Sequence, residues 1–158
     1  KAHEARGESG RVIEWRDNGA WVVPRMVELV ERWKPVAVAV QDKGPSGAVE
    51  VEIRAAGIKL PVDKDRPKRG DLINPWASDV ADAYGMTLDK LRRRELFHLD
   101  EAPLNAGMAR AESRKLSGST DWSTDVYAPV RGLSLALWAY VTRVDAVTTT
   151  YDPLANIG

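Results

Sequence analysis

Three aspartates of this chain have the chemical type and the setting to act together. Asp42 comes two residues after Val36–Val40, a run of small or β-branched apolar residues, and Asp121 and Asp125 precede an apolar segment at 130–142. They are far apart in the sequence, so only the fold can bring them together. If they meet, carboxylates with no cysteine or histidine beside them form a site for hard cations such as Mg²⁺, Mn²⁺ or Ca²⁺. Two such ions close together activate water and stabilise the leaving oxygen in phosphodiester cleavage.

A simpler interpretation of the same aspartates is that they cap helices. Asp42 comes shortly before the predicted helix 46–56, and Asp125 comes shortly before the predicted helix 130–142. An aspartate in that position commonly accepts a hydrogen bond from a backbone N–H of the first helical turn. The residues alone leave both interpretations open.

The composition excludes several other kinds of site. The 158 residues include no cysteine and only two histidines, His3 and His98, which excludes disulfides, thiolate metal sites and histidine-rich zinc sites. No GxxxxGK[ST] motif is present, so ATP hydrolysis by that route is excluded. We interpret His98 as a packed or capping residue. The formal net charge is zero, so nucleic-acid binding would need a local basic patch.

The segment Val36–Gly47 is the element expected to position Asp42. An unbroken run of small and β-branched apolar residues is typical of a strand buried on both faces of a sheet. The run ends at Gln41 and Asp42, and the turn-forming residues 44–47 follow. Ligand sites in α/β proteins lie where such a strand ends beside a loop.

The rest of the chain predicts alternating helices and strands. The predicted helices are 23–34, 46–56, one that begins at residue 74 or 78 and ends at 94, 100–111, and 130–142. The predicted strands are 36–40, 58–62 and an edge strand at 96–99, with a hairpin at 1–17 that turns at 7–10, a charged loop at 63–70, and a hairpin or loop at 115–125. This alternation is typical of an α/β sheet with parallel pairing. No apolar run reaches membrane-spanning length.

Six stretches of the sequence, taken in order, carry a resemblance to a known family. They are WVVPRMVELV (21–30), VAVAVQDKGPSG (36–47), DVADAYGMTLD (79–89), LRRRELFHLDEAPLNAGMARAESRKL (91–116), APVRGLSLALWAY (128–140) and YDPLANIG (151–158). Together they resemble the nuclease domain of the large terminase subunit of tailed bacteriophages, of the actinobacterial phage or prophage type. The resemblance covers most of the chain from about Arg11 onward. The ordered set is specific, whereas no single stretch is.

The resemblance implies a fold and an activity. The expected fold is α/β, a ribonuclease-H-like mixed β-sheet flanked by α-helices, over residues 1–144, with a C-terminal tail at 145–158. The expected activity is a metal-dependent endonuclease that cleaves double-stranded viral DNA with two Mg²⁺ or Mn²⁺ ions. Asp42 and Asp125 would bind the ions, with Asp121 a weaker candidate. Four basic residues would contact DNA phosphates: Lys43, Arg110, Arg114 and Lys115.

The family also implies partners. Its nuclease domain follows an ATPase motor in the same subunit, which this chain does not contain. It works with the portal protein and the small terminase subunit at the procapsid portal, in the cytoplasm of the bacterial host. We therefore expect those partners, and double-stranded DNA, for this chain.

The chain departs from the family pattern in three places. The family has an aspartate on a first strand, which we expect to be missing here. Gln41 falls at a family acid, with Asp42 one residue late, and a shift of one residue turns a strand side chain to the other face. Asp125 is one residue farther from Pro129 than expected. Either the chain is truncated and catalytically incomplete, or its metal site is built differently.

Two other functions stay open on these residues. A domain that has lost an acid could serve as a DNA-binding module or as a docking module for the portal or motor. A ribonuclease-H-like enzyme could also act on a Holliday junction or on an RNA–DNA hybrid.

Overall fold

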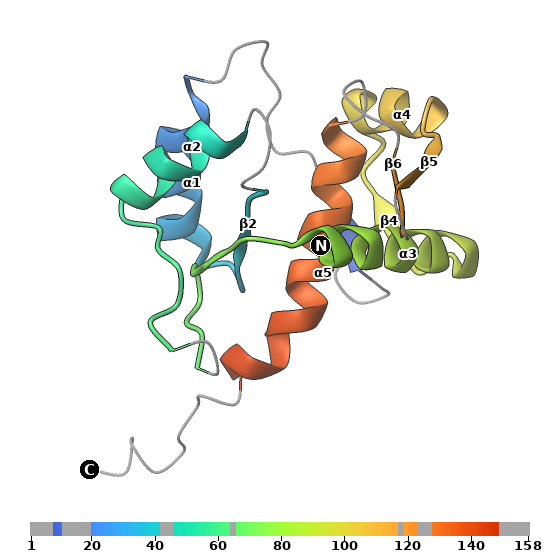
Figure 1. The fold of residues 1–158 in the computed structure, drawn as a ribbon. Coiled ribbons are helices and arrows are strands. Elements are labelled where there is room, and N and C mark those ends of the chain that lie inside the picture. The colour runs from blue at the N-terminus through green and yellow to red at the C-terminus, as the bar shows by residue number, and fades with distance from the viewer. Residues whose placement is uncertain are drawn as a thin grey trace. The chain divides into compact units, whose positions relative to one another are not determined.

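The structure is a computed structural model that describes residues 8–10, 20–41, 46–63, 66–116, 119–122 and 128–148. These ranges contain the elements β1 (Glu8–Gly10), α1 (Val22–Trp33), β2 (Val38–Ala39), α2 (Ser46–Ala55), β3 (Leu72–Ile73), α3 (Ala77–Arg93), β4 (Leu96–His98), α4 (Ala102–Ala109), β5 (Ser113–Leu116), β6 (Ser119–Trp122) and α5 (Ala128–Thr148) (Figure 1). The chain divides into two compact units. The hairpin unit comprises residues 1–17 and 76–138, and the strand-pair unit comprises residues 18–75 and 139–158.

The strand-pair unit is built on β2 and β3, which pair in parallel. Val38 is opposite Leu72 and Ala39 is opposite Ile73. The helices α1 and α2 lie side by side over β2 (Figure 1). Their apolar residues recur at helical spacing, so one face of each helix is buried. The buried core consists of Val38, Ile53, Ile58 and Leu72, and α1 packs Val23, Met26, Val27 and Val30 against it.

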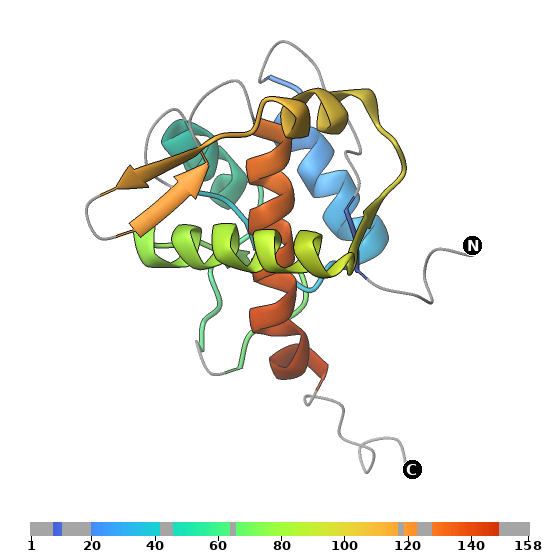
Figure 2. The same cartoon turned by 90° about the vertical axis from the view of Figure 1, so that its right-hand side faces the viewer.

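The hairpin unit takes its name from β5 and β6, an antiparallel pair that lies beside α3 (Figure 2). Its core consists of the buried residues Leu104, Trp122 and Val130. The helix α4 approaches Val130 closely at Gly107, where an added Cβ would lie 2.9 Å from the Cγ2 atom of Val130. In the same unit, β1 pairs in parallel with β4.

Most of the predicted elements are confirmed with small changes in their ends. All five predicted helices are present, and the strand predicted at 36–40 contains β2. The edge strand at 96–99 contains β4, and the hairpin or loop predicted at 115–125 overlaps the antiparallel pair of β5 and β6. The last helix continues to Thr148, so its final turn occupies the start of the segment predicted as a tail.

The strand predicted at 58–62 is wrong, because β2 pairs with Leu72–Ile73 instead. Pro61 has no backbone N–H to donate to a ladder, and Val62 is fully exposed. The segment still contributes to the core through Ile58, and its Lys59 carbonyl accepts a 2.8 Å hydrogen bond from the Leu72 N–H. Leu72 and Ile73 are both buried, which explains why this short pair forms the strand.

Two predicted boundaries near the ends of elements are also wrong. Residues 8–10, predicted as part of a turn, form β1, because their backbone groups pair with those of β4. The helix predicted from Asp100 begins at Ala102, since Asp100 has a left-handed backbone with φ of 61°. The rest of the hairpin predicted at 1–17 lies outside the described residues.

The class of the fold is α/β, as predicted, with five helices and short strands. In the described ranges the strands form three separate two-stranded sheets, two of them parallel and one antiparallel. A ribonuclease-H-like sheet is not evident in this arrangement. None of the helices in the described part of the chain combines the length and the apolar character that crossing a lipid bilayer requires.

Candidate functional site

The two principal metal candidates and one basic candidate lie outside the described residues. They are Asp42, Asp125 and Lys43. A shared metal site between the two aspartates therefore stays a prediction. The described residue next to Asp42 in the sequence is Gln41, which is partly buried and lies two positions after the end of β2.

The carboxyl ends of β2 and β3 meet at one edge of the strand pair. The backbone N–H of Val40 donates a 3.0 Å hydrogen bond to the carbonyl of Ile73, so the parallel pairing continues one step beyond β2. Gln41 and Asn74 are therefore the next residues to leave the pair at this edge. The edge where parallel strands end is the usual place for ligand chemistry in α/β proteins.

A buried carboxylate lies next to this edge. Glu50 belongs to α2, its side chain is only 10% exposed, and its Oε1 accepts a hydrogen bond of 3.3 Å from Nδ2 of Asn74. The Nη1 atom of Arg54, one helical turn later, lies 3.4 Å from the same oxygen. Because both of these contacts go to Oε1, the described side chains leave the second carboxylate oxygen of Glu50 available.

Asn74 also has an unused oxygen. Its Oδ1 is buried and has no hydrogen-bond partner in the described part of the structure. A buried polar atom usually has such a partner, so an exception needs an explanation. Glu50 and Asn74 thus place polar groups beside the carboxyl ends of β2 and β3, and each keeps one oxygen without a described side-chain partner.

Sequence reasoning missed both of these residues. Glu50 stands in the polar-looking stretch VEVEIR, and Asn74 was interpreted as a possible helix start. A signal was present, because Glu50 is three residues before Ile53 and so shares the apolar face of α2. A carboxylate on the buried face of a helix is rare and usually has a partner or a ligand.

A divalent cation fits this edge only in part. In the ranges that the structure describes, no group of three or more histidine, cysteine, aspartate or glutamate residues could hold a metal ion. The residues that could contribute are Glu50 and Asn74, with Asp42 from the sequence prediction. Mg²⁺ is often bound by one or two carboxylates and keeps several waters, so a small set of protein oxygens is sufficient for it.

Asp121, the weaker metal candidate, is buried, and protein groups bind both of its carboxylate oxygens. It is 1% exposed, and its Oδ1 accepts a 2.7 Å hydrogen bond from the backbone N–H of Trp122. Its Oδ2 accepts a 2.5 Å charge-assisted hydrogen bond from Nη2 of Arg131 on α5. A cation could reach this carboxylate only by displacing the guanidinium group.

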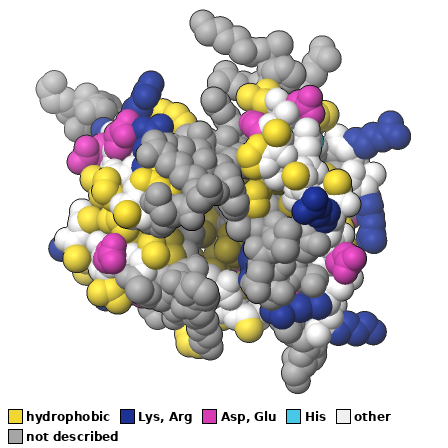
Figure 3. Space-filling view, turned by 90° about the horizontal axis from the view of Figure 1, so that it is seen from above, with side chains coloured by type: hydrophobic (Ala, Val, Ile, Leu, Met, Phe, Trp, Pro, Cys, Tyr) yellow, Lys and Arg dark blue, Asp and Glu magenta, His cyan; other side chains and the backbone are white. Residues whose placement is uncertain are grey.

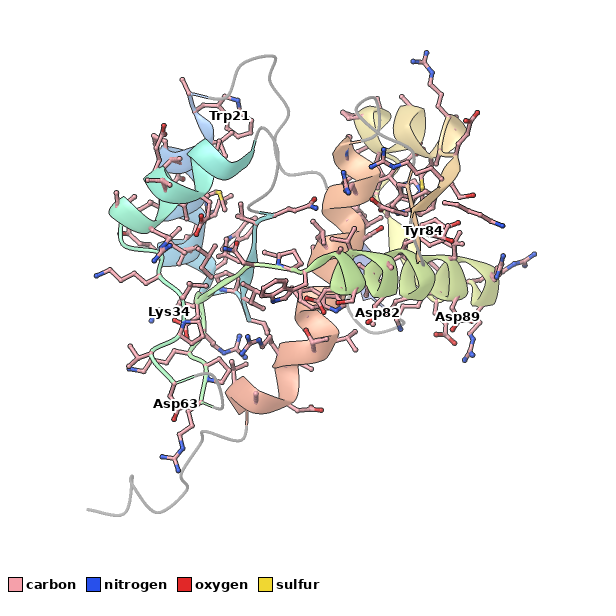
Figure 4. All side chains as sticks on the ribbon, viewed as in Figure 1. Trp21, Lys34, Asp63, Asp82, Tyr84 and Asp89 are labelled. Carbon is pink, nitrogen blue, oxygen red and sulfur yellow. The ribbon has the colours of Figure 1, made fainter. Side chains whose placement is uncertain are left out.

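Aromatic and hydroxyl groups hold the strand of Asp121 in place. The indole N–H of Trp122 donates a 2.9 Å hydrogen bond to Oγ of Ser134, and this hydroxyl donates to the carbonyl of Val130 at 3.0 Å. Tyr84 of α3 meets Trp122 edge to face, with ring centroids 4.8 Å apart. Figure 4 labels Tyr84 on α3, together with Asp82 and Asp89 of the same helix. These contacts fix the position of Asp121.

The basic candidates of the hairpin unit differ in exposure. Arg110 follows α4 and is exposed, as is Lys115 on β5. Arg114 is partly buried and is opposite Asp121 in the β5–β6 register, so the two residues share a face of the hairpin. Its neighbour Lys115 is on the other face, because side chains alternate along a strand. Arg114 and Lys115 therefore cannot contact one DNA surface in the same way.

The surface carries charges of both signs. Figure 3 shows acidic and basic side chains interspersed with apolar ones. This distribution agrees with the formal net charge of zero. A strong, purely electrostatic attraction to DNA is therefore not expected from the described surface.

Comparisons with known proteins add no further assignment. No family model matches the chain, and neither a curated protein nor a solved structure matches it.

Proposed function

We propose that this chain is the metal-dependent endonuclease domain of a large terminase subunit of a tailed bacteriophage, with a ribonuclease-H-like fold. The observation that carries the proposal is the ordered set of six stretches that resemble this family. The set begins with residues of α1, continues through β2, α3, β4, α4 and β5, and includes the first part of α5. The parallel pair β2–β3, which Asp42 follows in the sequence after Gln41, supports the proposal.

In this proposal the side chains have separate roles. Asp42 and Asp125 hold two Mg²⁺ or Mn²⁺ ions, which would activate water and stabilise the leaving oxygen of the DNA phosphodiester. Lys43, Arg110 and Lys115 contact phosphates and hold the duplex. Arg114 has a smaller part in DNA binding, because it is partly buried beside Asp121.

Nicking of supercoiled plasmid by the purified chain tests the proposal. We expect cutting with Mn²⁺ or Mg²⁺, none with EDTA, and loss of cutting in Asp42→Ala and in Asp125→Ala. Asp82→Ala is the matched control, since Asp82 is an exposed aspartate on α3 (Figure 4) and should be dispensable. If the chain cuts and either test variant keeps full activity, the site assignment is wrong.

Gln41 favours a second candidate function. Gln41 places an amide shortly after β2, where the family has an acid. This amide suits a module that no longer cleaves DNA and instead binds DNA or docks onto the portal or the motor. DNA binding that needs no metal, with no plasmid cutting, would support this function over the first. In either case phosphate contacts make the affinity fall steeply as salt rises.

A ribonuclease-H-like enzyme for another substrate gives a different result. If a Holliday junction or an RNA–DNA hybrid is cut in preference to plasmid duplex in a competition assay, the proposed terminase substrate is wrong.

A further inference from the structure

A group of basic side chains lies at the amino ends of β2 and β3, away from the strand ends where the metal site is proposed. Its members are exposed: Lys34, which ends α1, and Arg66, Lys68 and Arg69, which belong to the loop before β3. We call these four residues the basic patch. Figure 4 labels Lys34 in this part of the strand-pair unit.

The loop that carries the basic patch is fixed to the end of α1. The N–H of Gly70 donates a 2.8 Å hydrogen bond to the carbonyl of Pro35, and Nη1 of Arg69 donates one of 3.3 Å to the carbonyl of Lys34. Gly70 has a φ of +83°, and a Cβ added there would lie 3.0 Å from Cγ1 of Val30. A glycine is therefore needed for this close approach of the loop to α1.

The acid at the end of the loop organises the backbone. Oδ2 of Asp71 accepts a 2.6 Å hydrogen bond from the N–H of Lys68, and the N–H of Asp71 donates one of 3.1 Å to the carbonyl of Lys68. In the ranges that the structure describes, no carboxylate forms an ion pair with a side chain of the basic patch. The positive charges of the patch are therefore not compensated by ion pairs within the described structure.

Uncompensated lysine and arginine side chains at a surface suit phosphate groups. Arginine donates two parallel hydrogen bonds to a phosphate, and lysine attracts it as a point charge. Because the chain has no net charge, nucleic-acid binding needs a local basic patch. The helix dipole of α1 would explain Lys34 without a ligand. It does not explain Lys68 and Arg69, which belong to a loop.

We propose that the basic patch binds the phosphate backbone of double-stranded DNA, at a place separate from the strand ends where cleavage is proposed. The choice of DNA as the ligand rests on the proposed nuclease function, whereas the uncompensated positive charge does not. The patch holds the duplex and takes no part in cleavage. Its loss should therefore weaken DNA binding and leave the cutting rate at saturating DNA unchanged.

Fluorescence anisotropy of a labelled short duplex, titrated with the full chain in EDTA, tests the patch. The test variant combines Lys34→Gln and Lys68→Gln, because the described hydrogen bonds of both residues involve only their backbones. We expect at least about fivefold weaker binding at low salt. The slope of log affinity against log salt should become shallower by about 1–2, as expected when one or two phosphate contacts are lost.

A control variant removes the same charge from the other unit. It combines Arg92→Gln and Arg94→Gln, two exposed residues at the end of α3. Arg94 matches Lys34, because both end a helix in the left-handed conformation, with φ of 57° and 44°. The control should bind the duplex nearly as tightly as the unchanged chain does. Thermal unfolding checks that both variants keep the stability of the unchanged chain.

Three results would overturn the assignment of the basic patch to DNA. The first is an equal affinity of the test variant and the control variant. The second is displacement of the duplex by polyglutamate as readily as by unlabelled DNA, since the patch would then not select phosphate. The third is absence of duplex binding by the unchanged chain at low salt.

The outcomes also separate the basic patch from the proposed nuclease. If the test variant alone binds DNA weakly and the unchanged chain cuts no plasmid, the patch stands and the nuclease proposal fails. If plasmid is cut and the test variant binds DNA as the unchanged chain does, the nuclease stands and the patch fails.

Discussion

Two buried carboxylates, one in each unit, differ in how their oxygens are satisfied. Asp121 is 1% exposed, and both of its oxygens accept short hydrogen bonds, one from a backbone N–H and one from Arg131. Glu50 is 7% exposed when the whole residue is counted, and the described side chains reach only one of its oxygens, at 3.3 Å or more. The first is an ion pair with both oxygens hydrogen-bonded, whereas the second is compensated at one oxygen only.

The difference between Asp121 and Glu50 shows that burial of an acid does not by itself indicate how completely its charge is compensated. A buried charge must be compensated, and a compensation that is complete within the protein leaves nothing for a ligand to gain. Where it is incomplete, as at Glu50, the carboxylate keeps an oxygen that no described side chain reaches. The sequence suggested the opposite ranking, because it marked Asp121 as a candidate and passed over Glu50.

The largest effect should come from breaking the completed pair with Asp121→Asn. The change leaves the guanidinium of Arg131 without its counter-charge, and removing one partner of a buried pair costs roughly 3–5 kcal/mol. Arg131 is 29% exposed, so we expect a smaller loss than this, about 2–3 kcal/mol, in the free energy of unfolding by urea.

An exposed ion pair provides the control for this measurement. Asp89 lies 3.1 Å from Nε of Arg93 on α3, and both side chains are more than half exposed. Asp89→Asn should therefore cost less than about 0.5 kcal/mol. If the two variants lose the same stability, Asp121 does not have the structural role assigned to it.

The sequence predicted the helices well because their signals are local. Apolar spacing, Pro35 after α1 and Gly57 after α2, with its φ of +100°, mark helix ends within a few residues. The partner of β2 could not be predicted in this way. Leu72–Ile73 is a pair of residues without alternation, and it forms a strand only because it meets Val38–Ala39 from a distant part of the chain.

The candidate site was predictable only where a residue stands at the end of a recognisable element. Asp42 follows an apolar strand, so the sequence marked it at once. Glu50 and Asn74 become neighbours across 24 positions, and their contact depends on the packing of α2 over β3. Arg131 as the partner of Asp121 was equally hidden, because the two residues lie in different predicted elements, ten positions apart.

A smaller effect should follow from Ser134→Ala, which tests the hydrogen bonds that hold the strand of Asp121 in place. Ser134 is 2% exposed and accepts the indole hydrogen bond of Trp122. Its loss leaves a buried N–H unpaired, which should lower the free energy of unfolding by about 1–2 kcal/mol. In a Trp122→Phe background the same change should cost much less, and an equal cost there would contradict this explanation.

Glu50→Gln should change stability least among the buried sites when no divalent cation is present. The glutamine side chain keeps the shape and removes a poorly compensated buried charge, so we expect a change within about 1 kcal/mol, in either direction. Urea unfolding in EDTA measures it beside Asp121→Asn. A loss as large as that of Asp121→Asn would show that Glu50 is also a completed structural pair.

The smallest effect on stability should come from changing a carboxylate at the surface. Glu28 pairs with Arg25 one turn earlier on α1, at 2.5 Å, and the hydrogen bond and charge of Arg25 lower the pKa of Glu28 below its ordinary value. A carboxyl with a lowered pKa in the folded state adds stability above its unfolded pKa, and that contribution is lost as the pH falls through the folded pKa. Glu28→Gln should therefore lower the unfolding temperature slightly at pH 7, and the difference from the unchanged chain should shrink towards pH 3. A difference that grows on acidification would show that the sign assigned to this pair is wrong.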